Sequence, residues 1–157
     1  MSRIPDAADR RWMREALRAA RDAGRRGDVP VGALILDRRG RRLAAGSNRP
    51  LRNLDPTAHA EIVALRRAAR RAGNYRLTGA TLYCTLEPCP MCLGALVHAR
   101  VGRLVYAASD PKGGGISLGI FPWKGANHTL RVSSGPLVEE ASALLRDFFR
   151  SRRKEAR

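Results

Sequence analysis

Two short motifs constrain the fold of this chain more than any other feature. Residues 59–61 read His-Ala-Glu and residues 88–92 read Pro-Cys-Pro-Met-Cys, with 26 residues between the two motifs. One imidazole and two thiols are the donor set of a zinc site that keeps its fourth position open, whereas a structural zinc usually takes four protein ligands. The fold must therefore bring His59, Cys89 and Cys92 together, and we predict one zinc ion per chain.

Glu61 lies two residues after His59 and is the predicted catalytic residue. A carboxylate next to the open zinc position can act as general base and then as general acid. The chain has 3 cysteines, and two of them form a Cys-x-x-Cys pair. This pattern favours metal binding in a reducing compartment, by default the cytoplasm, over a disulfide framework. The remaining Cys84 is interpreted as a small core residue, and it is the candidate fourth ligand if the zinc were structural.

Hydrophobic patterning predicts the elements around these motifs. Short apolar runs predict strands over residues 31–36, 42–47, 80–85, 103–107 and 129–132. Helical spacing predicts helices over residues 7–26, 58–72 and 137–154, and one that starts at Pro88 or Pro90 and runs to about His98. The first two strands should form an antiparallel hairpin, and strand 80–85 should be central. Helices alternating with strands imply an α/β fold whose sheet is covered on both faces.

The predicted helix ends place both motifs at helix N-termini. Thr57 is the predicted cap of the second helix, and Gly73 is its predicted stop. The His-Ala-Glu motif then lies in the first turn of this helix. The two motif cysteines are three residues apart at the start of the next helix, so their sulfurs share one face. A helix N-terminus also lowers the pKa of a thiol and favours the metal-binding thiolate.

Length and charge narrow the class of protein. At 157 residues the chain is predicted to be a single domain over residues 1–157, with a core of about 7–153 and a basic C-terminal tail. No apolar run approaches the roughly 20 residues that span a bilayer, and the N-terminus lacks the apolar region of a signal peptide. A formal net charge of +16 suits a polyanionic partner such as RNA. An arginine-rich composition would give the same charge, so it carries little weight alone.

Further segments agree with one family. They are Val-Pro-Val-Gly-Ala at 29–33, Asn-Arg-Pro at 48–50, residues 55–64, Asn-Tyr-Arg-Leu at 74–77 and Asp-Phe-Phe-Arg at 147–150. With the zinc motifs, they make the chain resemble the bacterial tRNA-specific adenosine deaminases, which form inosine at the wobble position. The resemblance covers roughly residues 10–153. The zinc motifs alone are shared by the broad class of zinc nucleobase deaminases, so the flanking segments carry the closer resemblance.

The resemblance implies a fold, a reaction and partners. The fold is the cytidine-deaminase-like three-layer α/β/α sandwich around a five-stranded mixed sheet. The reaction is hydrolytic deamination of adenosine to inosine in a tRNA anticodon loop, with Glu61 moving protons to N1 and to the amine leaving C6. The resembled proteins are homodimers whose tRNA contacts both subunits.

The resemblance also implies a set of substrate contacts. Asn48 corresponds to an asparagine that contacts the flipped base, and Val29 and Leu86 correspond to pocket walls. Asp110 and Lys112 match positions in a loop that borders the active site. After Lys112 the chain departs from the Gly-Gly-Ala-Ala-Gly-Ser type of run common in the family and reads Gly-Gly-Gly-Ile-Ser. Three glycines indicate a loop that is either mobile or tightly turned. Farther along, Trp123 would either stack a base or close the loop onto the core.

Two other functions are compatible with the motifs. The first is a small-molecule deaminase of guanine, cytosine or a nucleoside, which would share the zinc ligands and Glu61. Its substrate distinguishes it, because it releases ammonia from free bases. The second is a non-catalytic RNA-binding module with a structural zinc. It requires a fourth protein ligand and leaves Glu61 without a role.

Overall fold

The structure is a computed structural model that describes residues 6–157. The predicted domain begins at residue 1, so its first five residues lie outside the described part. The elements in chain order are α1 (Ala7–Arg25), β1 (Gly32–Leu36), β2 (Arg42–Ser47), α2 (Pro50–Asn53), α3 (Ala60–Ala72), β3 (Thr81–Leu86), α4 (Pro90–His98), β4 (Arg103–Ala108), β5 (Arg131–Ser134) and α5 (Val138–Glu155). All the predicted elements are present, and the short helix α2 is an additional one.

The strands form one mixed sheet in the order β2-β1-β3-β4-β5. Strand β1 pairs antiparallel with both β2 and β3. Strand β4 pairs parallel with β3 and with β5. The predicted hairpin, the central position of β3 and the five-stranded mixed sheet are all confirmed.

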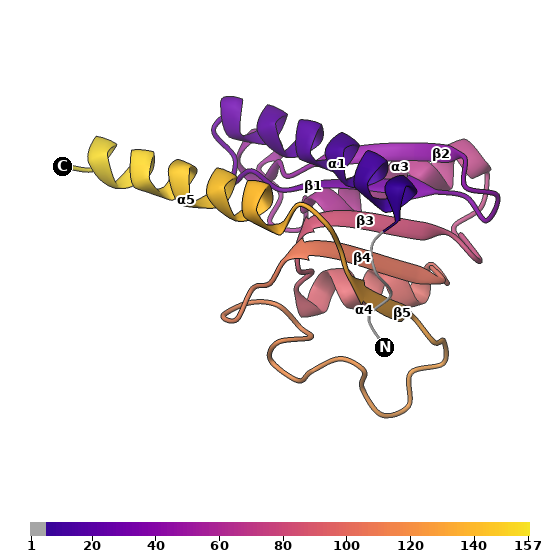
Figure 1. Cartoon of the computed structure of the whole chain (residues 1–157). Helices are drawn as coiled ribbons and strands as arrows, with labels where there is room; N and C mark the ends of the chain where they lie inside the picture. The colour runs from indigo at the N-terminus through magenta and orange to yellow at the C-terminus, as the bar shows by residue number, and fades with distance from the viewer. Residues whose placement is uncertain (1–5) are drawn as a thin grey trace.

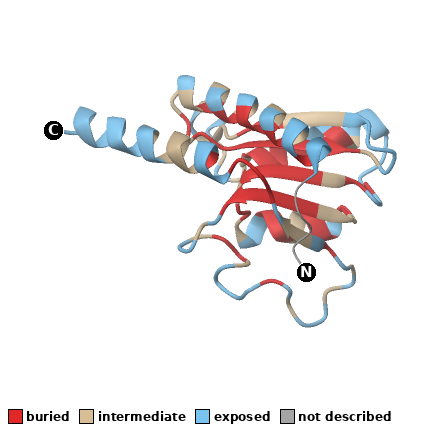
Figure 2. Ribbon diagram, viewed as in Figure 1, coloured by how far each residue is buried: buried red, intermediate tan, exposed pale blue. Residues whose placement is uncertain are grey.

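Helices cover both faces of the sheet (Figure 1). On one face, α1 and α5 pack over side chains that alternate along the strands, among them Leu34, Tyr83 and Val105. On the other face, α3 and α4 pack over the intervening side chains, such as Ile35 and Leu82. Figure 2 shows the central strands β1, β3 and β4 buried between the helical layers. The three-layer α/β/α sandwich is therefore confirmed, because strand side chains alternate between two apolar faces that each need a cover.

The start of α3 differs from the prediction. His59, with φ −68° and ψ 154°, is the N-cap residue, and the helix begins at Ala60. Thr57 was wrongly predicted as the cap: its hydroxyl donates to Oδ1 of Asp55 at 2.7 Å, and its N–H donates to the same oxygen at 2.8 Å. This turn at Asp55 keeps the chain extended for two further residues. Gly73 ends α3 in the left-handed region, at φ 65°, as predicted.

The C-terminal helix projects from the body. Its first half packs against the sheet, where Ala141 is buried, whereas the second half extends away from the sandwich (Figure 1). Exposed side chains cover this projecting half (Figure 2). The predicted basic tail is therefore mostly helical and accessible. None of the helices in residues 6–157 is long and apolar enough to cross a membrane.

Candidate active site

The N-terminal ends of α3 and α4 carry the two motifs. His59 is the N-cap of α3 and Cys89 is the N-cap of α4, so both have extended backbones just before a helix. A Cβ on Gly46 of β2 would collide with the backbone of Ala60 and Ala64. Glycine there lets the first turn of α3 lie directly against the sheet. The prediction that both motifs occupy helix N-termini is confirmed.

The three predicted zinc ligands converge. Nδ1 of His59 lies 3.6 Å from Sγ of Cys89 and 3.6 Å from Sγ of Cys92. Zinc bonds of about 2.0–2.1 Å to nitrogen and about 2.3 Å to sulfur in a tetrahedron place the donors about 3.6 Å apart. The donor set and its spacing therefore fit a zinc ion.

The ligand set stops at three. Within residues 6–157, His59, Cys89 and Cys92 form the single group of His, Cys, Asp or Glu side chains close enough to share a metal ion. Cys84 is fully buried, as predicted for a core residue, and is outside this group. This geometry therefore provides three protein ligands and an open fourth position. Among the residues that the structure describes, it does not provide the four protein ligands of a structural zinc site.

Local hydrogen bonds prepare the donors for a metal ion. The contact with Cys92, followed by that with His59, lowers the pKa of the Cys89 thiol to about 4, so that a thiolate is present at neutral pH. The hydrogen bond to Cys89 raises the pKa of His59. The pKa of Cys92 is raised because it carries the proton that the two sulfurs share. A metal ion that binds takes the place of this proton.

Glu61 is a buried carboxylate in the first turn of α3. Only 4% of its surface is exposed, and burial raises its pKa. The Cys84 thiol next to it partly opposes this by hydrogen bonding to the carboxylate. Glu61 is not itself one of the clustered donors. A buried carboxyl group with a raised pKa beside a metal site has the properties of a proton carrier.

The predicted base-contacting residues lie at ends of strands. Asn48 directly follows β2, is half-buried, and donates its backbone N–H to the carbonyl of Val31 at 3.0 Å. Val29 and Leu86 are half-buried and pack against the core cluster under α3 and α4. Their roles toward a substrate remain predictions.

The loop after β4 is held by its own side chains. Oδ1 of Asp110 accepts the backbone N–H groups of Lys112 at 3.2 Å and Gly113 at 3.1 Å. One carboxylate oxygen of Asp110 is therefore used within the loop. The side chain of Lys112 is exposed.

Glu87 is an anchor of this loop that the motif analysis missed. It is 2% exposed, and it accepts hydrogen bonds from the N–H of Asp110 at 2.9 Å and from the N–H and hydroxyl of Ser117, each at 2.6 Å. Burial alone would raise the pKa of Glu87, but these bonds outweigh it and hold the pKa below its ordinary value. An acidic residue directly before the Pro-Cys motif was the available signal.

The loop with three consecutive glycines was predicted to be either mobile or tightly turned, and the structure shows the tightly turned form. A Cβ on Gly114 would overlap the carboxylate of Glu87, and one on Gly115 would overlap the side chain of Leu93 in α4. The amide of Gly115 also donates to the carbonyl of Pro88 at 3.0 Å. The loop therefore packs tightly against the start of α4, next to the metal ligands.

Trp123 closes the loop onto the core. It packs against the core cluster and meets Phe121 edge to face, with 5.5 Å between ring centroids. Both rings line a cavity of about 440 Å³ with Ile116 and His128. Of the two predicted roles for Trp123, the structure shows the packing one.

Comparisons with known proteins agree with this site. The profile of the family described as the cytidine and deoxycytidylate deaminase zinc-binding region matches residues 6–108. A tRNA-specific adenosine deaminase of Haemophilus influenzae is 46% identical over 156 residues, which is 98% of this chain and 90% of the relative.

Solved structures agree as well. One from a study of A-to-I editing by tRNA:A34 deaminases at the wobble position of transfer RNA superimposes with a TM-score of 0.81 at 43% identity, covering 87% of this chain and 99% of that one. A guanine deaminase from Bacillus subtilis superimposes with a TM-score of 0.62 at 30% identity, covering 92% of this chain and 93% of that one. The chain belongs to the zinc-binding cytidine and deoxycytidylate deaminase family, and within it to the tRNA-specific adenosine deaminases.

Proposed function

We propose that this protein is a zinc-dependent hydrolase that converts adenosine to inosine at the wobble position of a tRNA anticodon. The observation that carries the proposal is the His59, Cys89 and Cys92 donor set with 3.6 Å spacings and a buried carboxylate in the adjoining helix turn. The likeness to wobble-editing deaminases over most of the chain supports adenosine as the target base.

Each site residue has a distinct role. His59, Cys89 and Cys92 hold the ion. When bound, zinc acts as a Lewis acid and lowers the pKa of a coordinated water. Glu61 accepts a proton from water and delivers it to N1 of the adenine. It then takes the second proton of that water, from the hydroxyl group now on C6, and gives it to the amine, which leaves C6 as ammonia. Its burial supports this role, because a raised pKa makes the carboxylate a better proton acceptor.

The substrate contacts follow from the positions around this centre. A base must leave its stack to reach the metal, and an anticodon loop offers unpaired bases at little energetic cost. Asn48 carries a donor and an acceptor that can read a base edge. Val29 and Leu86 supply apolar walls, and the exposed amine of Lys112 reaches a loop phosphate. Asp110 acts mainly by shaping the loop that carries Lys112.

The protein acts as a cytoplasmic single-domain homodimer in this proposal. Three large apolar side chains near the ends of α2 and α4 are exposed: Leu51 at 67%, Leu54 at 91% and Met91 at 38%. Large apolar side chains that are left exposed favour association. A second copy of the chain would cover these side chains. Their exposure therefore supports the predicted homodimer.

The test is deamination of RNA against deamination of free bases. The zinc-loaded protein is incubated with the anticodon stem-loop of an arginine-type tRNA, and conversion of the wobble adenosine is scored by sequencing. Parallel reactions with guanine and cytosine are assayed for ammonia. We expect inosine at the wobble position alone. Ammonia from guanine with an unchanged stem-loop would instead favour the small-molecule deaminase, which shares the same metal ligands.

A further inference from the structure

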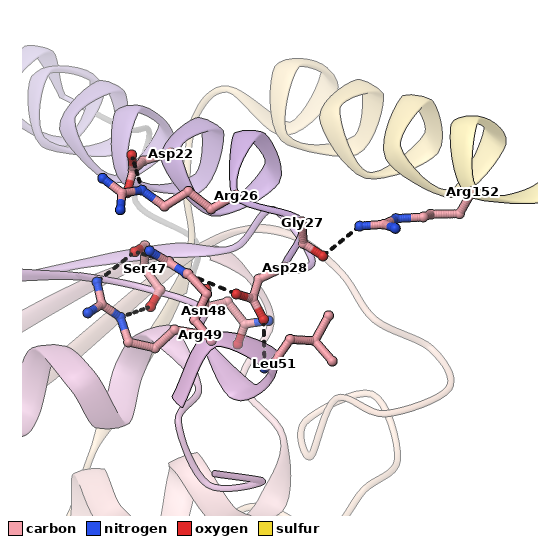
Figure 3. A network of polar contacts seen from close by, with 10 residues as sticks. Asp22, Arg26, Gly27, Asp28, Ser47, Asn48, Arg49, Leu51 and Arg152 are labelled. Carbon is pink, nitrogen blue, oxygen red and sulfur yellow. Dashed lines mark hydrogen bonds and ion pairs between the residues drawn. The ribbon is translucent and has the colours of Figure 1, made fainter. Parts of the chain in front are cut away.

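Another buried carboxylate lies outside the metal site, between α1 and β1. This residue, Asp28, is 1% exposed. Its Oδ1 accepts the backbone N–H of Leu51 at 2.9 Å, and its Oδ2 accepts Nε of Arg52 at 3.0 Å. Figure 3 shows the Asp28 carboxylate directed at α2, which follows Asn48 and Arg49.

Arg52 extends this contact to the residues before α2. Its side chain is 22% exposed and pairs with Asp28. Its second nitrogen lies 3.4 Å from the hydroxyl of Ser47 and 3.4 Å from the carbonyl oxygen of Asn48. Asp28 therefore holds the backbone of Asn48 through one intermediate, the Arg52 guanidinium, and holds the start of α2 directly.

The segment depends on this anchor. Helix α2 has 4 residues, and its N-cap residue Arg49 provides no side-chain hydrogen bond to the helix. So short a helix is not stable in isolation. The N–H of Leu51, in its first turn, has no partner within the helix and donates to the Asp28 carboxylate instead. The adjoining Gly27 carbonyl accepts from Arg152 of α5 at 2.8 Å, so the backbone next to Asp28 is tied down as well (Figure 3).

We propose that Asp28 is a positioning residue for the target base, acting through Arg52 and α2 to hold Asn48 in place to read the base edge. The proposal rests on the function proposed above, which assigns base contact to Asn48. A buried carboxylate and a guanidinium joined by hydrogen bonds have a defined geometry. Asn48 lies between β2 and α2, outside any helix or strand. The contacts of Asp28 therefore help to fix its position.

A double-mutant cycle tests this role. Asp28→Asn preserves the shape of the side chain but removes the charge that Arg52 pairs with. We expect kcat/KM for the anticodon stem-loop to fall by roughly 10- to 100-fold, the scale of a small misplacement of a substrate contact. In an Asn48→Ala background the same change should cost less than about 2-fold, because the contact that Asp28 positions is already gone. An equal loss in both backgrounds would overturn the proposal, since a general loss of stability does not depend on Asn48.

The matched control is Asp22→Asn. Asp22 also pairs with arginines, Arg25 and Arg26, but at the surface of α1. This variant should retain wild-type kcat/KM, and all variants should retain one zinc per chain.

Hydrogen exchange separates this proposal from the proposed function. Asp28→Asn should speed exchange of the Leu51 amide by roughly 10-fold or more, and Asp22→Asn should leave it unchanged. If Asp28→Asn does not fold, Arg52→Gln replaces it, because it removes the other partner of the Asp28–Arg52 pair. The exchange rate of the Leu51 amide is then measured in that variant. Unchanged exchange at Leu51 would overturn the anchor. If exchange changes as expected but wild type leaves RNA untouched, the proposed function fails, and the cycle is run on whichever free base the wild type deaminates.

Discussion

At the scale of single residues, two neighbouring buried groups have different roles. Glu61 and Cys84 contact each other, and burial raises the pKa of both. Cys84 thus stays a neutral thiol at physiological pH. Glu61 lies in the first turn of the helix whose N-cap is His59, and it is the group here suited to carry protons.

Removing the Glu61 carboxylate separates catalysis from metal binding. We expect Glu61→Gln to retain one zinc per chain while kcat falls by about 10²- to 10⁴-fold, the usual contribution of a general acid–base group. Metal analysis and single-turnover deamination measure the two effects. Cys92→Ala is the contrasting variant, which should lose zinc as well. Full turnover by zinc-loaded Glu61→Gln would refute the assignment.

At the scale of elements, the loop between β4 and β5 is fastened to the metal-binding helix. Glu87 takes three hydrogen bonds from it, and Gly114 lies against the Glu87 carboxylate. Glu87 lies just before α4, whose N-cap is Cys89, and Gly115 packs against Leu93 of α4. The loop and the metal site are therefore expected to respond together to changes at Glu87 or Gly114.

A pair of glycine substitutions tests this fastening. Gly114→Ala forces a methyl group into the Glu87 carboxylate and should lower the free energy of unfolding by about 1–3 kcal/mol, as overpacking does. Gly94→Ala is the control, because a Cβ there meets nothing within 4 Å and the position is helical. It should be neutral or stabilising by up to about 1 kcal/mol. Urea unfolding measures both, and equal effects would contradict the tight packing at Gly114.

The Glu87 anchor should depend on pH with a defined sign. The folded-state pKa of Glu87 lies below its ordinary value, so the folded protein binds fewer protons there than the unfolded chain. Its contribution is fully present above the unfolded pKa of about 4.3 and is lost as the pH falls through the folded value. Glu87→Gln should be less stable than wild type at pH 7, by a difference that shrinks below about pH 4. A pH-independent difference would contradict this linkage.

At the scale of the whole molecule, positive charge is in large excess over negative charge. The formal net charge is +16, and the projecting half of α5 carries exposed basic residues beyond the sandwich. A polyanion such as RNA gains from releasing counterions when it binds such a surface. We therefore expect the charge to supply affinity for RNA, and the residues around the metal site to supply the choice of base.

Salt should weaken binding of the RNA without changing the fold. Raising NaCl from 50 to 200 mM should lower the affinity for the anticodon stem-loop by roughly 10-fold or more, depending on how many phosphates are contacted. Fluorescence anisotropy with labelled stem-loop measures this, and the melting temperature at each salt concentration serves as the control. An affinity that does not change with salt would show that the arginines do not contribute to RNA binding.

Local patterns were enough to predict the layers of the fold and the metal ligands. Short stretches of sequence reveal the strand pattern, the helices that begin near 58 and 90, and the two motifs that contain His59, Cys89 and Cys92. This is possible because hydrophobic periodicity and the spacing within a motif are local properties. The same kind of local reasoning failed at Thr57, because the side chain of Asp55 accepts its N–H and hydroxyl in a turn before the helix.

Short sequence patterns were thus sufficient to identify the chemistry of the centre: which side chains can bind a metal ion, and which acid lies beside them. How the surrounding loops are held depends on contacts between distant segments. Asp28 lies 23 residues before the Leu51 amide that it binds, and Glu87 lies 30 residues before Ser117. No periodicity links such pairs, because each hydrogen bond exists only once the sheet has brought distant segments together.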